Sequence, residues 1–162
     1  MLRIADVSLT SIGALLDRYG LSVVMESFEQ PVTGSYWGDS EAGIVGSRVY
    51  IRPDTPVHSL LHEACHTICM SEERRSNLDR DARGDDLEEA SVCYLQILLA
   101  DEIVDVGKDR LMQDMDFWGY SFRLGSTGHW FKSDADDAVE WLVSHGLVDC
   151  AGSPTFKLRS GV

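Results

Sequence analysis

The chain has 162 residues, 44% of them hydrophobic and 9% aromatic, so it can build one real core and we predict a single domain over residues 1–162. The 27 acidic and 14 basic residues give a formal net charge of -13, which repels phosphate backbones and argues against direct nucleic acid binding. No stretch approaches 18 apolar residues, and the first twenty residues lack a signal-peptide pattern. We therefore expect a cytoplasmic protein that does not associate with membranes.

The cysteines agree with that compartment. Cys65, Cys69 and Cys93 lie in stretches that read as apolar helix, and Cys150 follows near the C-terminus. Unpaired cysteine behaves as a small buried hydrophobe, and the cytosol keeps thiols reduced. We expect reduced, mostly buried thiols.

The first part of the chain predicts a helix, a strand and a region of turns. Ser8 or Thr10 can cap a helix that runs to about Arg18. Residues 21–28 are rich in β-branched and apolar side chains and predict a strand. The Gly and Ser positions of residues 34–47 predict turns.

A second strand leads directly into a helix. Residues 47–52 alternate between apolar and polar side chains, which is typical of a strand. Two prolines then end the strand, and Thr55 as cap with Pro56 in the first turn can start a helix that runs to about Met70.

The second half of the chain is predicted to be mainly helical. Residues 71–86 are almost wholly polar and predict a solvated connection, whereas residues 87–100 predict a buried helix. An amphipathic helix is predicted at residues 108–118 and another at residues 133–145, with an aromatic, Gly-rich hairpin or loop at residues 120–131 between them. These elements together predict an α+β fold with a small sheet packed on helices.

The most specific feature is the sequence H-E-x-x-H formed by His62, Glu63 and His66. Residues four apart lie on one face of a helix, so both imidazoles can reach one zinc ion at about 2.0 to 2.1 Å. Glu63 lies at the edge of that face, where its carboxylate can take a proton from a water molecule held by the metal. The motif therefore predicts two metal ligands and a general base.

A catalytic zinc site needs one further protein ligand and one open position. The helix at residues 87–100 begins with Glu88 and Glu89, which we expect to lie at the polar end of a buried helix, where a carboxylate can face the metal. We predict Glu89 as the third ligand. Glu88 stays an alternative, because periodicity does not separate adjacent positions.

Three further side chains are candidates for supporting roles. His58 lies one helical turn before His62 and is either an extra ligand, a proton shuttle or a hydrogen-bonded histidine near the start of the helix. Tyr120 and His129 lie in the aromatic, Gly-rich region and are candidate donors to an oxyanion. Their alternatives are core packing for Tyr120 and an exposed loop position for His129.

Residues 44–101 resemble the ImmA/IrrE-type minimal zinc peptidases, through His62, Glu63, His66 and the pair Glu89-Ala90 that opens the apolar helix. The resemblance implies that His62, His66 and Glu89 bind zinc and that Glu63 is the base. It also implies that the strand VYIRPDTP, which precedes the active-site helix, is an edge strand beside the cleft that pairs with an extended substrate. The implied substrate is a cytosolic partner protein, such as a transcriptional repressor.

These observations predict a zinc-dependent peptidase. Two alternatives use the same ligands: a non-catalytic zinc-binding regulatory or interaction module, and a zinc hydrolase of a small amide. A closed pocket formed by Trp118, Tyr120 and Trp130 would favour the small substrate.

Overall fold

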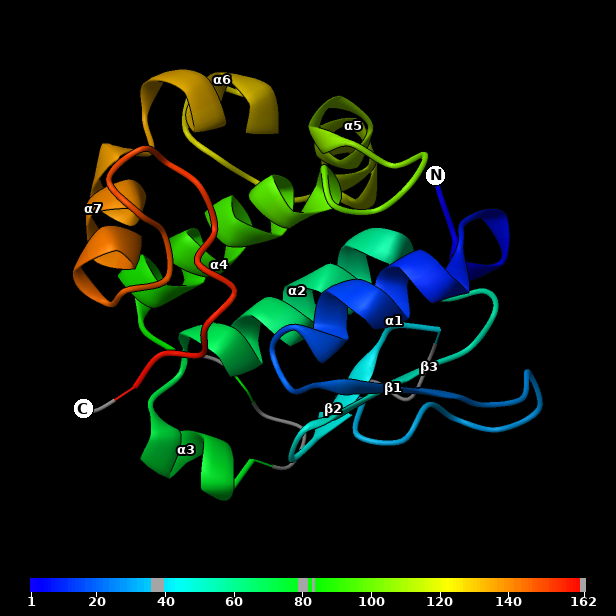
Figure 1. Ribbon diagram of the computed structural model, residues 1–162. Helices are drawn as coiled ribbons and strands as arrows, with labels where there is room; N and C mark the ends of the chain where they lie inside the picture. Colours follow the sequence, from blue (N-terminus) through cyan, green and yellow to red (C-terminus); the bar gives the residue numbers. More distant parts are fainter. Residues whose placement is uncertain (36–39, 79–81, 83, 161–162) are drawn as a thin grey trace.

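The computed structural model describes residues 1–35, 40–78, 82 and 84–160, and these residues form an α+β fold (Figure 1). Within them, seven α-helices and one short 3-10 helix accompany a three-stranded mixed sheet. The elements in chain order are η1 (Ile4–Asp6), α1 (Leu9–Asp17), β1 (Ser22–Met25), β2 (Gly43–Val45), β3 (Arg48–Ile51), α2 (Val57–Cys69), α3 (Glu72–Ser76), α4 (Asp86–Ala100), α5 (Lys108–Trp118), α6 (Thr127–Ser133) and α7 (Asp136–Ser144).

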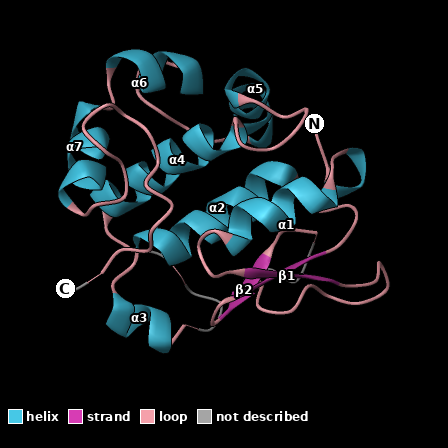
Figure 2. Ribbon diagram, in the orientation of Figure 1, coloured by secondary structure: helices cyan, strands magenta, loops and turns pink. Residues whose placement is uncertain are grey.

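Helix α2 lies in the middle of the molecule. The sheet is on one side of it, and helices α4 to α7 are on the other (Figures 1 and 2). One buried cluster of apolar side chains extends from Ile4 to Val148, and eleven of the thirteen residues of α2 are buried. In the part of the chain that the structure describes, no helix combines the length and the apolar character needed to cross a bilayer.

The sheet corrects one prediction. Its strand order is β1-β3-β2, with β1 parallel and β2 antiparallel to β3. The strand predicted at residues 47–52 is β3, which we expected at an edge and which lies in the centre. The expectation was wrong because β2 has only three residues, too few for a recognisable alternation, and lies where we predicted turns. The edges of the sheet are therefore β1 and β2.

The start of α2 also differs in detail from the prediction. Pro56 is the N-cap, and the Thr55 hydroxyl accepts a hydrogen bond from the backbone N–H of Arg52 at 2.8 Å. The hydroxyl therefore closes the turn between β3 and α2 and does not cap the helix. The chain's N-terminus braces this turn, since Ile4 N–H donates to the carbonyl of Thr55.

The remaining helices follow the predictions with two exceptions. Helices α1, α4 and α5 lie where they were predicted, and Ser8 is the cap of α1. The polar connection contains the short helix α3, capped by Ser71, whereas its residues 79–81 and 83 lie outside the described part of the chain. The predicted turn region likewise includes residues 36–39, which are not described.

The second exception is α6, which occupies part of the segment expected to be a hairpin or loop. The Ser126 side chain caps this helix by accepting a hydrogen bond from the backbone of His129. The glycines and aromatic residues in and around this short helix favoured the prediction of a hairpin or loop. Helix α7 accordingly starts at Asp136 and not at Ser133.

Candidate metal centre

Helix α2 presents His62 and His66 on the face that meets α4. The two residues are one turn apart, and their imidazole Nε2 atoms lie 3.0 Å from each other. The His66 side chain is buried, while 20% of the His62 side chain is exposed. The pair therefore lies at a point where the buried helix reaches solvent.

Helix α4 supplies the third group. A carboxylate oxygen of Glu89 lies 3.8 Å from His62 Nε2 and 3.4 Å from His66 Nε2. Three atoms with these separations lie on a circle of radius about 2.0 Å, which matches the bond lengths of zinc to histidine nitrogen and carboxylate oxygen. His62, His66 and Glu89 are thus arranged to hold one metal ion.

The chemistry of the three groups also fits a divalent cation. Burial lowers the pKa of His62, against a smaller opposing effect of its hydrogen bond to Gln96, so the neutral imidazole that binds metals is the favoured form. Two nitrogen donors and a carboxylate oxygen suit zinc and other first-row transition metals. With 31% of the Glu89 side chain exposed, the group is also accessible from solvent.

Glu88 faces other partners. Its side chain is almost fully buried and lies 2.7 Å from Arg74 Nη1 and 3.3 Å from Arg159 Nη1. Of the two neighbouring carboxylates, only Glu89 belongs to the His62–His66 group. The geometry therefore favours Glu89 as the third metal-binding residue, whereas Glu88 forms ion pairs with arginines.

Glu63 lies next to His62 on α2 and is half-buried. It is not a member of the metal-binding group found among the described residues. Its charge adds to the raised pKa of Tyr120. Among the described residues Glu63 is therefore a carboxylate adjacent in sequence to His62 and outside the metal-binding group.

Tyr120 joins the site from the segment between α5 and α6. Its ring centroid is 5.7 Å from that of His62, and its hydroxyl is 3.1 Å from His58 Nδ1. Burial raises the pKa of Tyr120 well above its ordinary value, and the charges of Glu63 and Glu41 add to the rise. The phenol is therefore a protonated hydrogen-bond donor at neutral pH.

His58 is a buried, neutral histidine and not a member of the metal group. Its ring packs against Trp118, with 5.0 Å between centroids, and it is only 1% exposed. Burial, with a smaller contribution from His62, lowers the pKa of His58 to about 4. Of the roles considered for His58, the structure shows the hydrogen-bonded histidine.

His129 lies on α6 and is exposed. Its backbone N–H donates to Ser126, and within the described part of the chain no hydrogen bond, ion pair or ring contact joins its side chain to the metal group. Of the two candidate oxyanion donors, the structure brings Tyr120 to the site and places His129 on the surface.

Sequence analysis missed Gln96. This residue of α4 is fully buried, and its side-chain oxygen lies 2.6 Å from His62 Nδ1. A signal was present, since Gln96 is the one amide in the apolar run 92–100 and lies seven residues after Glu89, on the same face of the helix. A buried amide two turns beyond a metal ligand is a candidate partner for another ligand.

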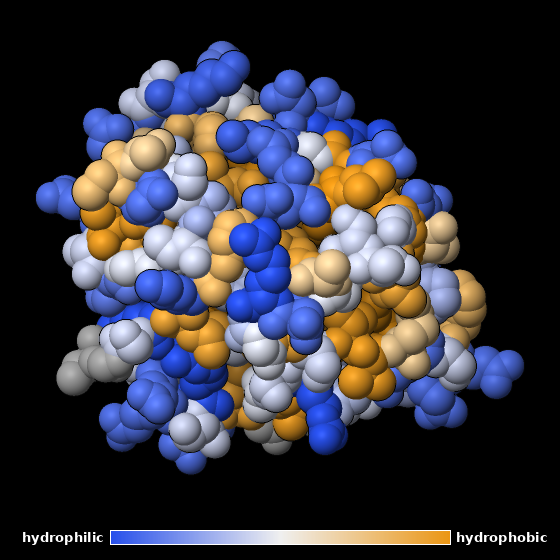
Figure 3. All heavy atoms as spheres, viewed as in Figure 1, coloured by the Kyte–Doolittle hydropathy of each residue, from blue (hydrophilic) through white to orange (hydrophobic). Residues whose placement is uncertain are grey.

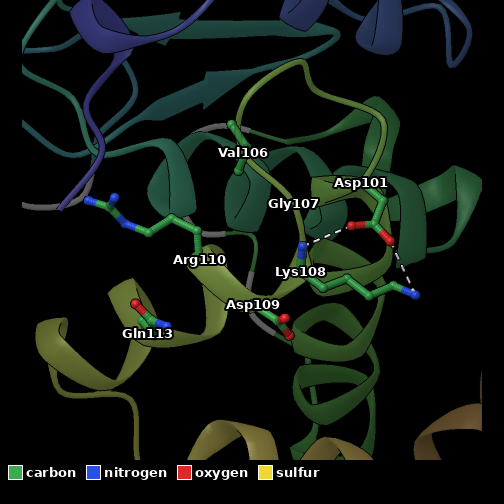
Figure 4. Close-up of a pocket in the computed structure, with 7 residues that line it drawn as sticks. All are labelled: Asp101, Val106, Gly107, Lys108, Asp109, Arg110 and Gln113. Atoms are coloured by element: carbon green, nitrogen blue, oxygen red, sulfur yellow. Dashed lines mark hydrogen bonds and ion pairs between the residues drawn. The ribbon is translucent and has the colours of Figure 1, made fainter.

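A surface hollow with a volume of about 580 Å³ lies at the turn between α4 and α5 (Figure 4). In it, Asp101 accepts a hydrogen bond from the backbone of Lys108 and pairs with its side chain at 3.3 Å. None of the metal-binding residues lines it. The hollow is thus separate from the metal centre.

A second hollow, of about 530 Å³, lies between α1 and the edge strand β1. Apolar residues gather over these two elements in Figure 3, and Leu9 and Met25 are 43% and 41% exposed. This hollow contains no histidine and no cysteine. It is an apolar surface feature on the other side of α2 from α4.

Comparison with known proteins gives no family for this chain. No family model, no curated protein and no solved structure matches it. The resemblance to the ImmA/IrrE-type peptidases therefore stays a prediction from the motif residues, and the function is argued from the metal centre itself.

Proposed function

We propose that this protein is a zinc-dependent peptidase, in which His62, His66 and Glu89 hold the metal and Glu63 is the general base. The observation that carries the proposal is the triangle of two imidazole nitrogens and one carboxylate oxygen at metal-ligand separations, next to a carboxylate that is not part of it. A purely structural zinc site has four protein ligands. The three candidate ligands found among the described residues, together with the neighbouring Glu63, favour a catalytic site.

When bound, a divalent metal supplies Lewis-acid polarisation of the scissile carbonyl and of the attacking water. Glu63 takes one proton from the water molecule while the water oxygen attacks the carbonyl carbon. As the C–N bond breaks, Glu63 gives that proton to the leaving amine nitrogen. The carboxylate is thereby regenerated, and one water molecule is consumed for each bond that is cleaved.

Tyr120 is the donor that we assign to the developing oxyanion. The raised pKa keeps its hydroxyl protonated, and its ring lies against that of His62. A fixed donor in a partly buried site stabilises developing negative charge more strongly than water does. His58, which contacts the same hydroxyl, holds it in place.

The proposed substrate is a peptide segment in extended conformation. Strand β2 is an edge of the sheet, it contacts α2, and the N–H of Ala42 just before it donates to Ser59 of α2 at 2.9 Å. The N–H of Ile44 in this edge already donates to the carbonyl of Gly34 at 3.2 Å, so we propose that an extended peptide runs beside α2 without adding to β2 at that position. The resemblance suggests a cytosolic partner such as a repressor as the source of that segment.

The test compares Glu63→Gln with His66→Ala in protein purified without chelators or a histidine tag. Zinc content is measured by elemental analysis, and hydrolysis is measured on fluorescein-labelled casein and on a mixture of synthetic peptides read by mass spectrometry. We expect about one zinc per chain in wild type and Glu63→Gln and none in His66→Ala, and of these three proteins we expect only wild type to hydrolyse the substrates. Glu140→Gln, the same change at an exposed position of α7, is the control.

Two results would contradict the proposal. If wild-type protein takes up no zinc even after zinc is added, the assignment of the metal centre is wrong. If Glu63→Gln leaves the activity of the zinc-loaded protein unchanged, the assignment of Glu63 as the base is wrong. Zinc binding with no cleavage of any substrate would instead support the non-catalytic module.

A further inference from the structure

Gln96 connects the two helices that supply the metal ligands. It lies on α4 with no exposed surface, and both ends of its amide contact α2. The side-chain oxygen is 2.6 Å from His62 Nδ1, and the side-chain nitrogen donates to the backbone carbonyl of His58 at 3.2 Å. No other described side chain hydrogen-bonds His62 Nδ1.

The contact with His58 fixes which way the amide points. A backbone carbonyl only accepts hydrogen bonds, so the NH₂ group of Gln96 must face it. The amide oxygen, which also only accepts, then faces His62 Nδ1. If the amide were turned over, two oxygens would meet at His58 and the hydrogen bond would be lost.

This orientation dictates the tautomer of His62. Because its Nδ1 faces an acceptor, the proton of the neutral imidazole lies on Nδ1. The lone pair is then on Nε2, the atom that faces His66 Nε2 and Glu89. A neutral histidine that must also bind metal through Nε2 needs this tautomer.

We propose that Gln96 is a positioning residue of the metal centre, which holds the ring of His62 in orientation and tautomer and thereby sets the metal affinity. The inference rests on the proposed metal centre. Partners of metal-binding histidines typically change metal affinity by about 10 to 100-fold when removed. We expect a loss in this range for a variant without the acceptor.

The neutral amide has a second consequence. The donor set of His62, His66 and Glu89 carries one negative charge, so a bound dication keeps one net positive charge. A carboxylate at position 96 would cancel that charge, bind the metal at least as tightly and weaken its polarisation of water and carbonyl. An amide at this position thus orients His62 without reducing the electrophilicity of the metal.

The experiment measures zinc affinity of the metal-free full-length protein by competition with a chromophoric chelator, for wild type, Gln96→Leu and Gln96→Glu. Leu removes the hydrogen bonds of the amide to His62 and His58, and also its hydrogen bond to the Tyr120 side chain. Glu can accept from His62 Nδ1 but, as a carboxylate, cannot donate to the His58 carbonyl. Gln113→Leu, at an exposed position of α5, is the control.

We expect Gln96→Leu to bind zinc about 10 to 100-fold more weakly, Gln96→Glu to bind as tightly as wild type or tighter, and Gln113→Leu to be unchanged. Rescue by Glu separates positioning from structural support, because Glu does not restore the bond to His58. Urea unfolding of each metal-free variant reports its stability separately. If Gln96→Leu does not fold, the zinc affinity of Gln96→Glu relative to wild type, together with the absorption spectrum of the cobalt form of Gln96→Glu, tests the role of position 96.

Unchanged affinity in Gln96→Leu, or weaker affinity in Gln96→Glu, would overturn the inference. If wild type binds zinc and His66→Ala does not, either result overturns the role of Gln96 and leaves the metal centre standing. If folded wild type binds no zinc, both proposals fail.

Discussion

Glu88 and Glu89 are neighbours on α4, yet they contact different parts of the protein. Glu89 faces His66 at 3.4 Å, whereas Glu88 lies 2.7 Å from Arg74, in a setting that leaves it 4% exposed. Successive residues of a helix point about 100° apart, so one helix start can serve both a metal group and a buried ion pair.

Substitutions at these two positions should therefore have opposite effects. Glu89→Gln should lose zinc binding and change the unfolding free energy of the metal-free protein by less than about 1 kcal/mol. Glu88→Gln should keep zinc and lower the free energy of unfolding by on the order of 2 to 3 kcal/mol, because it removes the buried carboxylate charge that pairs with the partly buried Arg159 side chain. Zinc stoichiometry and urea unfolding measure the two effects. Equal zinc loss in both variants would contradict the assignment of Glu89.

The stability of the metal-free protein should fall as the pH decreases from about 6.5 to about 4. The unfolded chain protonates His58 below its ordinary pKa of about 6.5, but the folded protein holds it neutral down to about 4. His58 therefore stabilises the fold above this window, and about 3 kcal/mol is lost across it. Urea unfolding at several pH values measures the slope.

His58→Phe should flatten this dependence, because phenylalanine does not titrate. The other titratable groups are the same in both proteins, so the difference between the two curves isolates the contribution of His58. Parallel curves would show that another group causes the loss of stability.

Tyr120→Phe should retain zinc, lower kcat by about 100-fold and leave KM nearly unchanged, since in the proposed mechanism the hydroxyl stabilises the oxyanion and does not bind the substrate in its ground state. The lost hydrogen bond to His58 should cost about 1 kcal/mol of stability. His129→Ala, at an exposed position, should change neither. Steady-state kinetics on a cleaved peptide provide the measurement, and a larger effect at His129 would reverse the assignment.

Gly43→Ala should destabilise the fold by more than about 2 kcal/mol. A Cβ atom at Gly43 would overlap the backbone of Thr33 and Ser35, so β2 would have to move away from the segment that crosses it. Gly13→Ala is the control, because a Cβ atom there meets no atom within 4 Å and alanine favours the helix α1. Thermal unfolding should show a lower Tm for the first variant and an equal or higher Tm for the second.

Local patterns in the sequence were sufficient for most of the helices. Ser8 and the periodic apolar residues after it predicted α1, and the continuous apolar run before Ala100 predicted α4. The same reasoning missed β2 and α6, because elements of three and seven residues are too short to show a period. Missing β2 turned the central strand β3 into an expected edge.

For the candidate metal centre too, the sequence predicted some features and the tertiary structure decided others. The spacing of His62 and His66 by itself predicted two imidazoles on one helix face, since residues four apart lie one helical turn apart. The choice between Glu88 and Glu89 depended on Arg74 and Arg159, which come from other segments. The bond from Gln96 to His62 likewise crosses between two helices. Such pairings depend on how α2 and α4 pack, and only the tertiary structure decides that.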